Sequence, residues 1–209
     1  MELAFLVTAF TALFVVIDPI GLAPVFAALT QGLSPAQRRK IAARACAVAT
    51  GILLIFAFLG EAVLEFLGIS MPAFRISGGI LLFLTALDML FERRQTRRQS
   101  QGDAPEEETG QDPSVFPIAI PLIAGPGSIA TIILLVGEAT TTLDAMLVVA
   151  IMLVTVGLVF VLFLVAGYLE RLLGKVGINV VTRLLGMLLA ALSVQFVLDG
   201  LASFGLGGS

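Results

Sequence analysis

The sequence predicts an all-α polytopic membrane protein whose six transmembrane helices form two inverted three-helix repeats, with the first and fourth helices broken. Three observations lead to this prediction. The 209-residue chain is 58% hydrophobic and only 13% charged, whereas a soluble domain is about 45–50% apolar and about 25% charged. It contains six apolar runs long enough to cross a bilayer, which takes about 20 residues. Motifs of the first half also recur in the second half at a nearly constant spacing.

The six predicted spans are residues 3–29, 43–67, 72–91, 115–137, 143–169 and 179–203. Polar or helix-breaking clusters separate them. In the first separator, Ser34 followed by Pro35 is typical of an N-cap with proline at the first helical position. The fifth separator is the stretch Gly174 to Gly177. The first run lacks a basic n-region and contains Asp18, so we interpret it as a retained helix and not as a signal peptide.

The Lys and Arg residues predict how the chain is oriented. With six spans, the loops after the first, third and fifth helices share one face of the membrane. All Lys and Arg residues except Arg75 lie in or next to those three loops. The positive-inside rule therefore places these loops in the cytoplasm and both termini outside.

The two halves resemble each other. Pro126 follows Pro19 by 107 residues, Glu170 follows Glu61 by 109 and Arg183 follows Arg75 by 108. Each half has three spans, an odd number, so the second half enters the membrane from the opposite side, as in many secondary transporters. The predicted units are repeat one at 1–91, a hydrophilic linker at 92–113 that we expect to be cytoplasmic and disordered, and repeat two at 114–209.

Two helix breaks are the most informative local feature. The first is Asp18-Pro19-Ile20-Gly21, after about 15 apolar residues, and the second is Gly125-Pro126-Gly127-Ser128. Asp is a favoured N-cap and proline a favoured first helical residue, so half-helices should start at Pro19 and Pro126. Their N–H groups lack intrahelical partners and would suit a carboxylate or phosphate. The candidate substrate-binding residues are Asp18, Pro19, Gly21, Gly125, Pro126, Gly127, Ser128 and Thr131.

Intramembrane polar residues are the candidates for coupling or gating, because such residues are expensive to insert and are usually functional. They are Asp18, Arg75, Arg183 and Gln195. Structural alternatives stay open for each. Asp18 would serve only as an N-cap, the two arginines would be interfacial anchors, and Gln195 would form a hydrogen bond between helices.

Composition also excludes several classes of function. The chain has no His and a single Cys, which leaves no recognisable metal-ligand set and no nucleophile-plus-base set. We therefore expect neither an enzyme nor a bound cofactor or metal. The net charge of −3 argues against a nucleic-acid partner. The expected partners are the lipid bilayer, a small-molecule solute and H⁺ or Na⁺ as a coupling ion. We expect Cys46 to be a small packed residue, and Gly78, Gly79 and Gly186 to allow close helix packing.

Four longer motifs carry a resemblance to a known family. They are DPIGLAPVF from Asp18, LSPAQRRK from Leu33, PAFRISGGILLF from Pro72 and PIAIPLIAGPGSIAT from Pro117. These motifs resemble those of the MarC family of bacterial and archaeal inner-membrane proteins, and the resemblance covers nearly the whole chain. It implies a plasma-membrane protein related to the LysE superfamily of six-helix amino-acid exporters, and the family's two breaks map onto Asp18, Pro19 and Gly21 and onto Gly125, Pro126 and Gly127. In many relatives Asn follows the first glycine, where this chain has Leu22.

The resemblance and the paired breaks together predict a secondary transporter of small neutral amino acids or similar zwitterions. It would work by alternating access, with the substrate carboxylate bound at the half-helix N-termini. Two alternatives stay open. The same anion-friendly site would suit a lipid phosphate, which makes a lipid or lipid-carrier flippase the second hypothesis. The third is a non-transporting accessory protein of the cell envelope.

Overall fold

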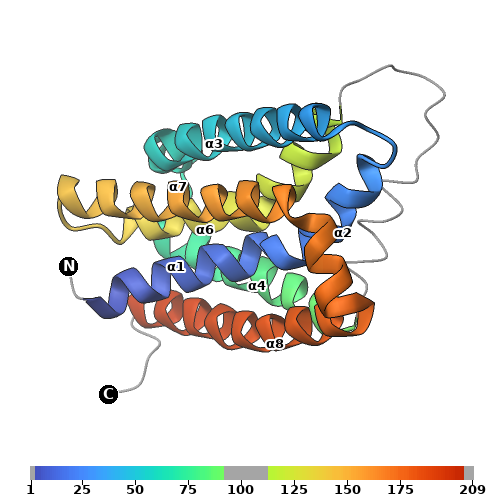
Figure 1. The fold of residues 1–209 in the computed structure, drawn as a ribbon. Helices are drawn as coiled ribbons and strands as arrows, with labels where there is room; N and C mark the ends of the chain where they lie inside the picture. Colours follow the sequence, from blue (N-terminus) through green and yellow to red (C-terminus); the bar gives the residue numbers. More distant parts are fainter. Residues whose placement is uncertain (1–2, 92–112, 205–209) are drawn as a thin grey trace.

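The computed structural model describes residues 3–91 and 113–204, and in these ranges the chain is almost entirely helical, with no strand. Five helices are long and apolar enough to cross a membrane, or six if one bent pair counts as a single span. Figure 1 shows the long helices side by side in a bundle. The predicted fold class, an all-α polytopic membrane protein, is confirmed. The predicted linker 92–113 lies, except for Pro113, outside the described residues.

The helices follow the predicted spans closely in the first half of the chain. The first span consists of α1 and α2, α3 makes the second and α4 the third. In the second half, an irregular helical segment, η1, and helix α6 make the fourth span, followed by α7 and α8. The bounds are α1 Leu3–Ile17, α2 Pro19–Leu29, α3 Pro35–Phe66, α4 Met71–Leu90, η1 Ser114–Ile123, α6 Pro126–Gly137, α7 Thr142–Leu164 and α8 Ala166–Ser203.

Helix α3 starts as its sequence predicts, although it begins eight residues before the predicted span. Ser34 caps it, since the Gln37 N–H donates to Ser34 Oγ over 3.3 Å and the Ser34 N–H donates to Gln37 Oε1 over 2.9 Å. This reciprocal capping box satisfies two donors at the helix end. The first turns of α3 carry Arg38, Arg39 and Lys40, so the helix extends out of the apolar run.

The predicted end of the fifth span is wrong, whereas the predicted break at Gly174 is present as a kink. Helix α7 ends at Leu164 instead of residue 169. Helix α8 then runs through the predicted separator and is kinked at Gly174, which has φ 62° and ψ 173°. Positive φ suits glycine because it has no Cβ. The residues before the kink form a short arm that lies across the end of the bundle, and the rest forms the sixth span (Figure 1).

The two halves exchange packing partners. Helix α3 packs against η1 and α6, the two arms of the fourth span, whereas α7 packs against α1 and α2, the two arms of the first. On the α2–α7 contact the rings of Phe26 and Phe163 stack with centroids 4.3 Å apart. The broken spans therefore lie mostly in the interior, between the unbroken spans that pack around them.

Helices α4 and α8 form the most extensive pair, and small residues bring them together. A Cβ added to Gly79 would lie 2.7 Å from the Ser193 carbonyl oxygen, and one added to Gly186 would lie 2.9 Å from Met89 Cβ. The expectation that Gly79 and Gly186 permit close packing is confirmed. Such stripes of small residues are typical of membrane helix pairs.

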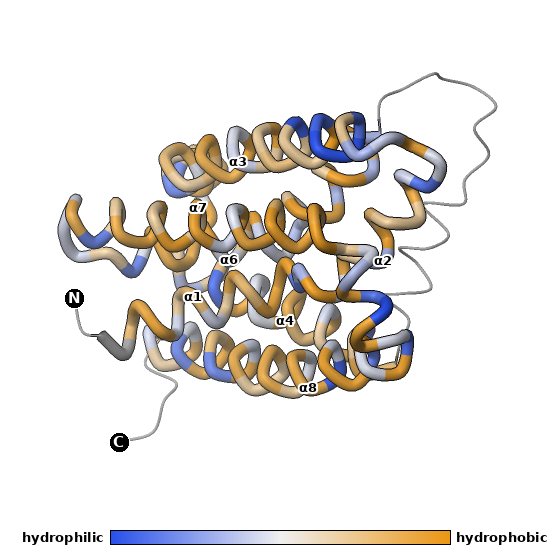
Figure 2. Tube along the Cα trace, viewed as in Figure 1, coloured by the Kyte–Doolittle hydropathy of each residue, from blue (hydrophilic) through white to orange (hydrophobic). Residues whose placement is uncertain are grey.

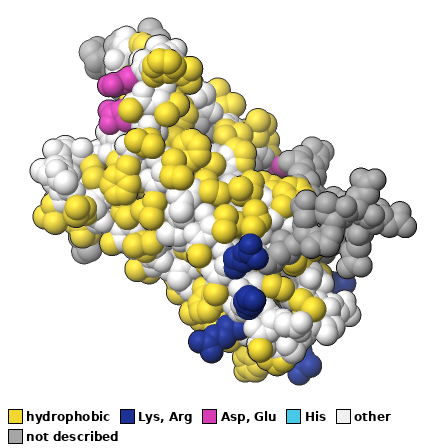
Figure 3. All heavy atoms as spheres, turned by 90° about the horizontal axis from the view of Figure 1, so that it is seen from above, with side chains coloured by type: hydrophobic (Ala, Val, Ile, Leu, Met, Phe, Trp, Pro, Cys, Tyr) yellow, Lys and Arg dark blue, Asp and Glu magenta, His cyan; other side chains and the backbone are white. Residues whose placement is uncertain are grey.

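Hydrophobic residues make up most of the middle of the bundle, and hydrophilic residues lie mostly toward its ends (Figure 2). Large apolar side chains such as Phe58, Leu84 and Val154 are exposed on its outer surface, as expected for a surface that faces lipid. Lys and Arg side chains gather toward one end of the face in Figure 3. This end, which we call the basic end, includes the start of α3 and the short arm of α8.

Replacing Gly79 with alanine should lower the thermal stability of the protein. The added methyl group would meet Ser193 backbone, which has no room to yield, and overpacking of this kind costs about 1–3 kcal/mol. The buried thiol of Cys46, which is 8% exposed, provides the readout because a thiol-reactive dye reports unfolding in detergent. As a control, Gly51→Ala adds a methyl group with nothing within 4 Å and should keep or slightly raise the melting temperature, because alanine favours a helix interior over glycine by about 0.5–1 kcal/mol. Equal melting temperatures for the two variants would contradict the packing described here.

Candidate functional site

The first break is built by Asp18. Its backbone adopts the left-handed conformation, with φ 58° and ψ 64°, between α1 and α2. The Asp18 N–H still donates to the Phe14 carbonyl over 2.9 Å, and the Asp18 carbonyl accepts from the Leu22 N–H over 3.0 Å. The chain thus turns at one residue while the hydrogen bonds on either side persist.

The Asp18 side chain completes this turn. Its Oδ1 accepts a hydrogen bond from the Gly21 N–H over 3.0 Å, and the residue is 0% exposed. A Cβ at Gly21 would collide with the Asp18 carboxylate, so only glycine fits there. The predictions that Asp18 caps a half-helix and that this half-helix begins at Pro19 are confirmed. One N–H at the start of α2 is therefore occupied by the protein itself.

The second break has a different construction. In η1, Phe116 and Ile120 have extended backbones, with φ near −125° and ψ of 129° and 124°. Each precedes a proline, whose ring disfavours the helical conformation of the residue before it. The chain then reaches Gly125, and α6 starts at Pro126, as predicted, at an angle of 54° to η1.

Ser128 holds the start of α6. Its Oγ accepts a hydrogen bond from the Gly125 N–H over 2.9 Å and lies 2.7 Å from the Ile123 carbonyl, to which it donates. Ser128 is buried, and the Thr131 hydroxyl donates to the Gly127 carbonyl over 2.8 Å. Both hydroxyl groups predicted to contact a substrate are thus bonded to their own backbone in this structure.

The two breaks lie next to each other. A Cβ on Gly127 would be 3.1 Å from Val16 Cγ1, in the last turn of α1, and 3.9 Å from Thr85 Oγ1 on α4. The start of α1 and the end of α6 share one end of the bundle (Figure 1). At 1.5 Å per residue, α1 is about 22 Å long and α6 about 18 Å, so both breaks lie at a similar depth.

The substrate-site candidates differ in how accessible they are. Asp18, Pro19, Gly21, Gly125, Ser128 and Thr131 are buried, whereas Gly127 is half-buried and Pro126 is exposed. The first turn of α6 is therefore the most exposed part of the paired breaks. Its N–H groups, at Gly127 and Ser128, have no carbonyl one turn earlier to accept them within an α-helix. With the partial positive charge of a helix N-terminus, this turn suits an anionic group.

A second polar cluster lies at the other end of α6. Arg75 on α4 forms an ion pair with Glu138, which caps the end of α6, over 3.1 Å. Glu138 lies just outside the α6 segment. Burial raises the pKa of the Glu138 carboxyl. The positive charge of Arg75 lowers this pKa, and the negative charge of the nearby Asp199 raises it further. The cluster therefore joins α4, α6 and α8 at this end, which we call the acidic end.

The remaining coupling and gating candidates do not gather with Asp18. Gln195 is exposed and donates to Asp199 on its own helix over 2.7 Å, so the interhelical hydrogen bond considered for Gln195 is not what the structure contains. Arg183 is exposed on α8, 12 residues before Gln195 and thus about 18 Å from it along the helix. Arg75 is thus the arginine that links helices at the acidic end in residues 3–91 and 113–204.

Sequence reasoning missed Glu138 as a functional candidate. The only available signal was its position immediately after an apolar run, which many interfacial carboxylates share. It also missed Arg38, whose Nε donates to the Thr30 carbonyl over 3.1 Å at the end of α2. No group of three or more Cys, Asp or Glu side chains placed to hold a metal occurs in the described ranges.

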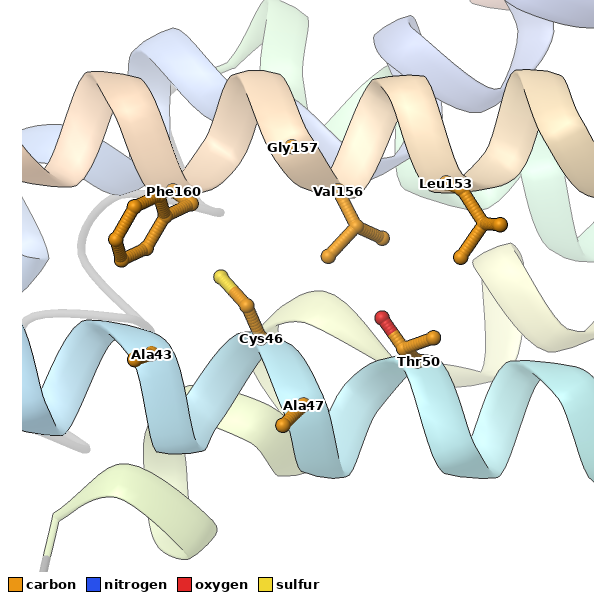
Figure 4. Close-up of a pocket in the computed structure, with 8 residues that line it drawn as sticks. All are labelled: Ala43, Cys46, Ala47, Thr50, Leu153, Val156, Gly157 and Phe160. Carbon is orange, nitrogen blue, oxygen red and sulfur yellow. The ribbon is translucent and has the colours of Figure 1, made fainter.

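An open groove of about 350 Å³ lies between the middle parts of α3 and α7. Figure 4 shows the Cys46 thiol and the Thr50 hydroxyl pointing from α3 toward apolar side chains of α7. The lining contains no charged side chain, so it offers nothing to hold a zwitterion. Cys46 packs among buried apolar residues, as expected.

Comparison with known proteins gives one consistent result. A family model described as MarC family integral membrane protein matches residues 3–204. A UPF0056 membrane protein of Archaeoglobus fulgidus is 39% identical over 201 residues, which cover 96% of this chain and 93% of the relative. One from Methanocaldococcus jannaschii is 35% identical, covering 96% of this chain and 98% of the relative. The UPF0056 inner membrane protein YhgN of Escherichia coli K12 is 35% identical, covering 94% and 95%. No solved structure gives a significant match.

Substituting Ser128 with alanine should destabilise the second break. The Gly125 N–H would lose its acceptor and the Ile123 carbonyl a donor, and each buried polar group left unpaired costs about 1–3 kcal/mol. Thiol-dye melting should show a clear drop for this variant. Ser77→Ala is the matched control, because its exposed hydroxyl bonds only to the Phe74 carbonyl one turn earlier. A Ser128→Ala protein as stable as the Ser77→Ala protein would mean that Ser128 does not hold the break.

Proposed function

Because this chain belongs to the MarC family of integral membrane proteins, we propose that it is a secondary transporter of small neutral amino acids or similar zwitterions, acting by alternating access. The observation that carries this proposal is the juxtaposition of the two breaks. The start of α6 lies against the last turn of α1, beside a buried Asp18. Interrupted helices at this depth are typical of the substrate sites of secondary transporters.

A zwitterion needs one site for its carboxylate and one for its ammonium group. The first turn of α6 serves the carboxylate, since its backbone is partly accessible and Gly127 has no side chain to keep a ligand away. At the first break, Asp18 already accepts the Gly21 N–H, so that end offers a carboxylate instead of free donors. Asp18 is therefore the group that binds the ammonium or the coupling ion, H⁺ or Na⁺.

The exchange of packing partners supports an inverted repeat. If α1, α2, α3 and α4 correspond to η1, α6, α7 and α8, the packing of α3 on η1 and α6 corresponds to that of α7 on α1 and α2. Two halves related in this way can rock against each other, which is the usual basis of alternating access.

The charged ends support an orientation and a gate. The positive-inside rule places the basic end in the cytoplasm and the acidic end, with both termini, outside. Arg75 and Glu138 then hold the outer ends of α4 and α6 together in this structure. Opening toward the outside requires this ion pair to separate, whereas opening toward the cytoplasm leaves it in place.

Transport by purified protein in liposomes tests the proposal. We expect labelled glycine, alanine or serine to accumulate when a proton or sodium gradient is imposed, and unlabelled amino acid to compete. Liposomes without protein and a lysine tracer serve as controls. If the gradient drives no neutral amino acid across while a fluorescent lipid is scrambled between leaflets, the flippase hypothesis replaces this one.

Asp18→Asn should uncouple transport without unfolding the protein. Asparagine tolerates the left-handed backbone and its side-chain oxygen can accept the Gly21 N–H, so the break should survive. It carries no charge to bind a cation, so gradient-driven uptake should fall by about tenfold or more, equivalent to at least ~1.4 kcal/mol. The control is Glu65→Gln, an exposed carboxylate at the far end of α3. Gradient-driven uptake that survives intact in Asp18→Asn would remove Asp18 from coupling.

A further inference from the structure

We infer that the basic end holds a binding site for the phosphate headgroup of an anionic phospholipid, separate from the proposed solute site. The site is a hollow of about 540 Å³ enclosed by three segments. The end of α2 contributes Ala27 and Gln31, α3 contributes Arg38, and the short arm of α8 contributes Glu170 and Arg171. A neighbouring hollow of about 330 Å³ shares Arg38 and adds Arg39.

Arg38 is held in place between the two hollows. Its Nε donates to the Thr30 carbonyl over 3.1 Å and its Nη2 donates to the Ala27 carbonyl over 3.4 Å. These bonds stabilise the end of α2, where the helix carries partial negative charge. They use two of the five guanidinium N–H groups, so donors remain for a ligand in a side chain that is already fixed. A pre-positioned guanidinium loses little entropy when it binds a phosphate.

The charges around the hollows favour an anion. The two hollows together are lined by three arginines, Arg38, Arg39 and Arg171, and by one carboxylate, Glu170. Neither Arg39 nor Arg171 forms an ion pair within the part of the chain that the structure describes. Glu170 would repel a phosphate, but it is outnumbered by three guanidinium groups that bind phosphate oxygens well. Glu170 can balance only one of the three positive charges, so the two hollows keep an excess of positive charge.

The surroundings favour a lipid over a soluble anion. Apolar side chains, among them Phe163 and Leu164, line the smaller hollow. On the short arm, Tyr168 is 69% exposed and Leu172 is 66% exposed. This arm lies across the end of the bundle (Figure 1), at the depth where a transmembrane helix leaves the hydrocarbon. A lipid there would place its phosphate among the arginines and its acyl chains along the exposed apolar side chains. Basic hollows between helices at the cytoplasmic face bind anionic headgroups in this way.

Native mass spectrometry of the purified full-length protein tests the inference. The protein in detergent is titrated with phosphatidylglycerol, with phosphatidylcholine of the same acyl chains, and with inorganic phosphate. We expect phosphatidylglycerol to bind in preference to phosphatidylcholine. In the double variant Arg39→Ala/Arg171→Ala its affinity should fall on the order of tenfold. Arg38 is left intact because it also stabilises the end of α2.

The double variant Lys40→Ala/Lys175→Ala is the matched control, since it removes two exposed positive charges of the basic end that line neither hollow. It should bind phosphatidylglycerol as the wild type does. Equal losses in both double variants would overturn the inference, because they would mean a diffuse attraction to surface charge. Equal binding of the two lipids would overturn it too, and so would displacement of phosphatidylglycerol by millimolar phosphate, which would identify a site for the free anion. These outcomes do not depend on amino-acid transport.

Discussion

The structure depends on one constraint: a backbone N–H or carbonyl group that leaves the helical pattern inside a membrane must find a partner within the protein. This chain breaks two spans and meets the constraint locally each time. At the first break a carboxylate accepts the Gly21 N–H, and at the second a hydroxyl group bridges the Gly125 N–H and the Ile123 carbonyl. Because the two solutions differ, the two breaks differ in charge. One presents a buried acid and the other a partly accessible helix start.

The packing of the bundle follows from the same constraint. Irregular backbone that faces lipid is costly, and the broken spans lie mostly in the interior, with α3, α4, α7 and α8 packed around them. Each half supplies helices that pack on the broken span of the other half. In the proposed function, this exchange couples the two halves, because a motion of one half moves the wall around the break of the other. Helices α4 and α8 also join the two halves through a close contact, which Gly79 and Gly186 make possible.

Local sequence signals predicted the breaks well, because caps and prolines act within one turn. Asp18 with Pro19, and Ser34 with Pro35, mark helix starts from their own chemistry, whatever surrounds them. The kink in α8 was harder to predict. The stretch from Gly174 to Gly177 has the composition of a loop, but a single positive φ at Gly174 turns the chain and the helix resumes at once. Tertiary contacts such as the pairing of Arg75 with Glu138 join residues 63 positions apart, and no local pattern specifies such a partner. Gln195 is a different case, because its partner Asp199 lies only four residues further along the same helix.

The proposed function requires a substrate carboxylate to bind the backbone at the start of α6. Solid-state NMR on protein labelled with ¹⁵N at glycine, in lipid bilayers with ¹³C-carboxyl alanine, measures the carbon–nitrogen distance directly. A hydrogen bond of about 2.9 Å from N to O places the carboxylate carbon within about 4 Å of the amide nitrogen, so we predict dephasing between the bound alanine and Gly127 that disappears when unlabelled alanine is added in excess. Bound alanine with no coupling to the Gly127 amide would contradict the account.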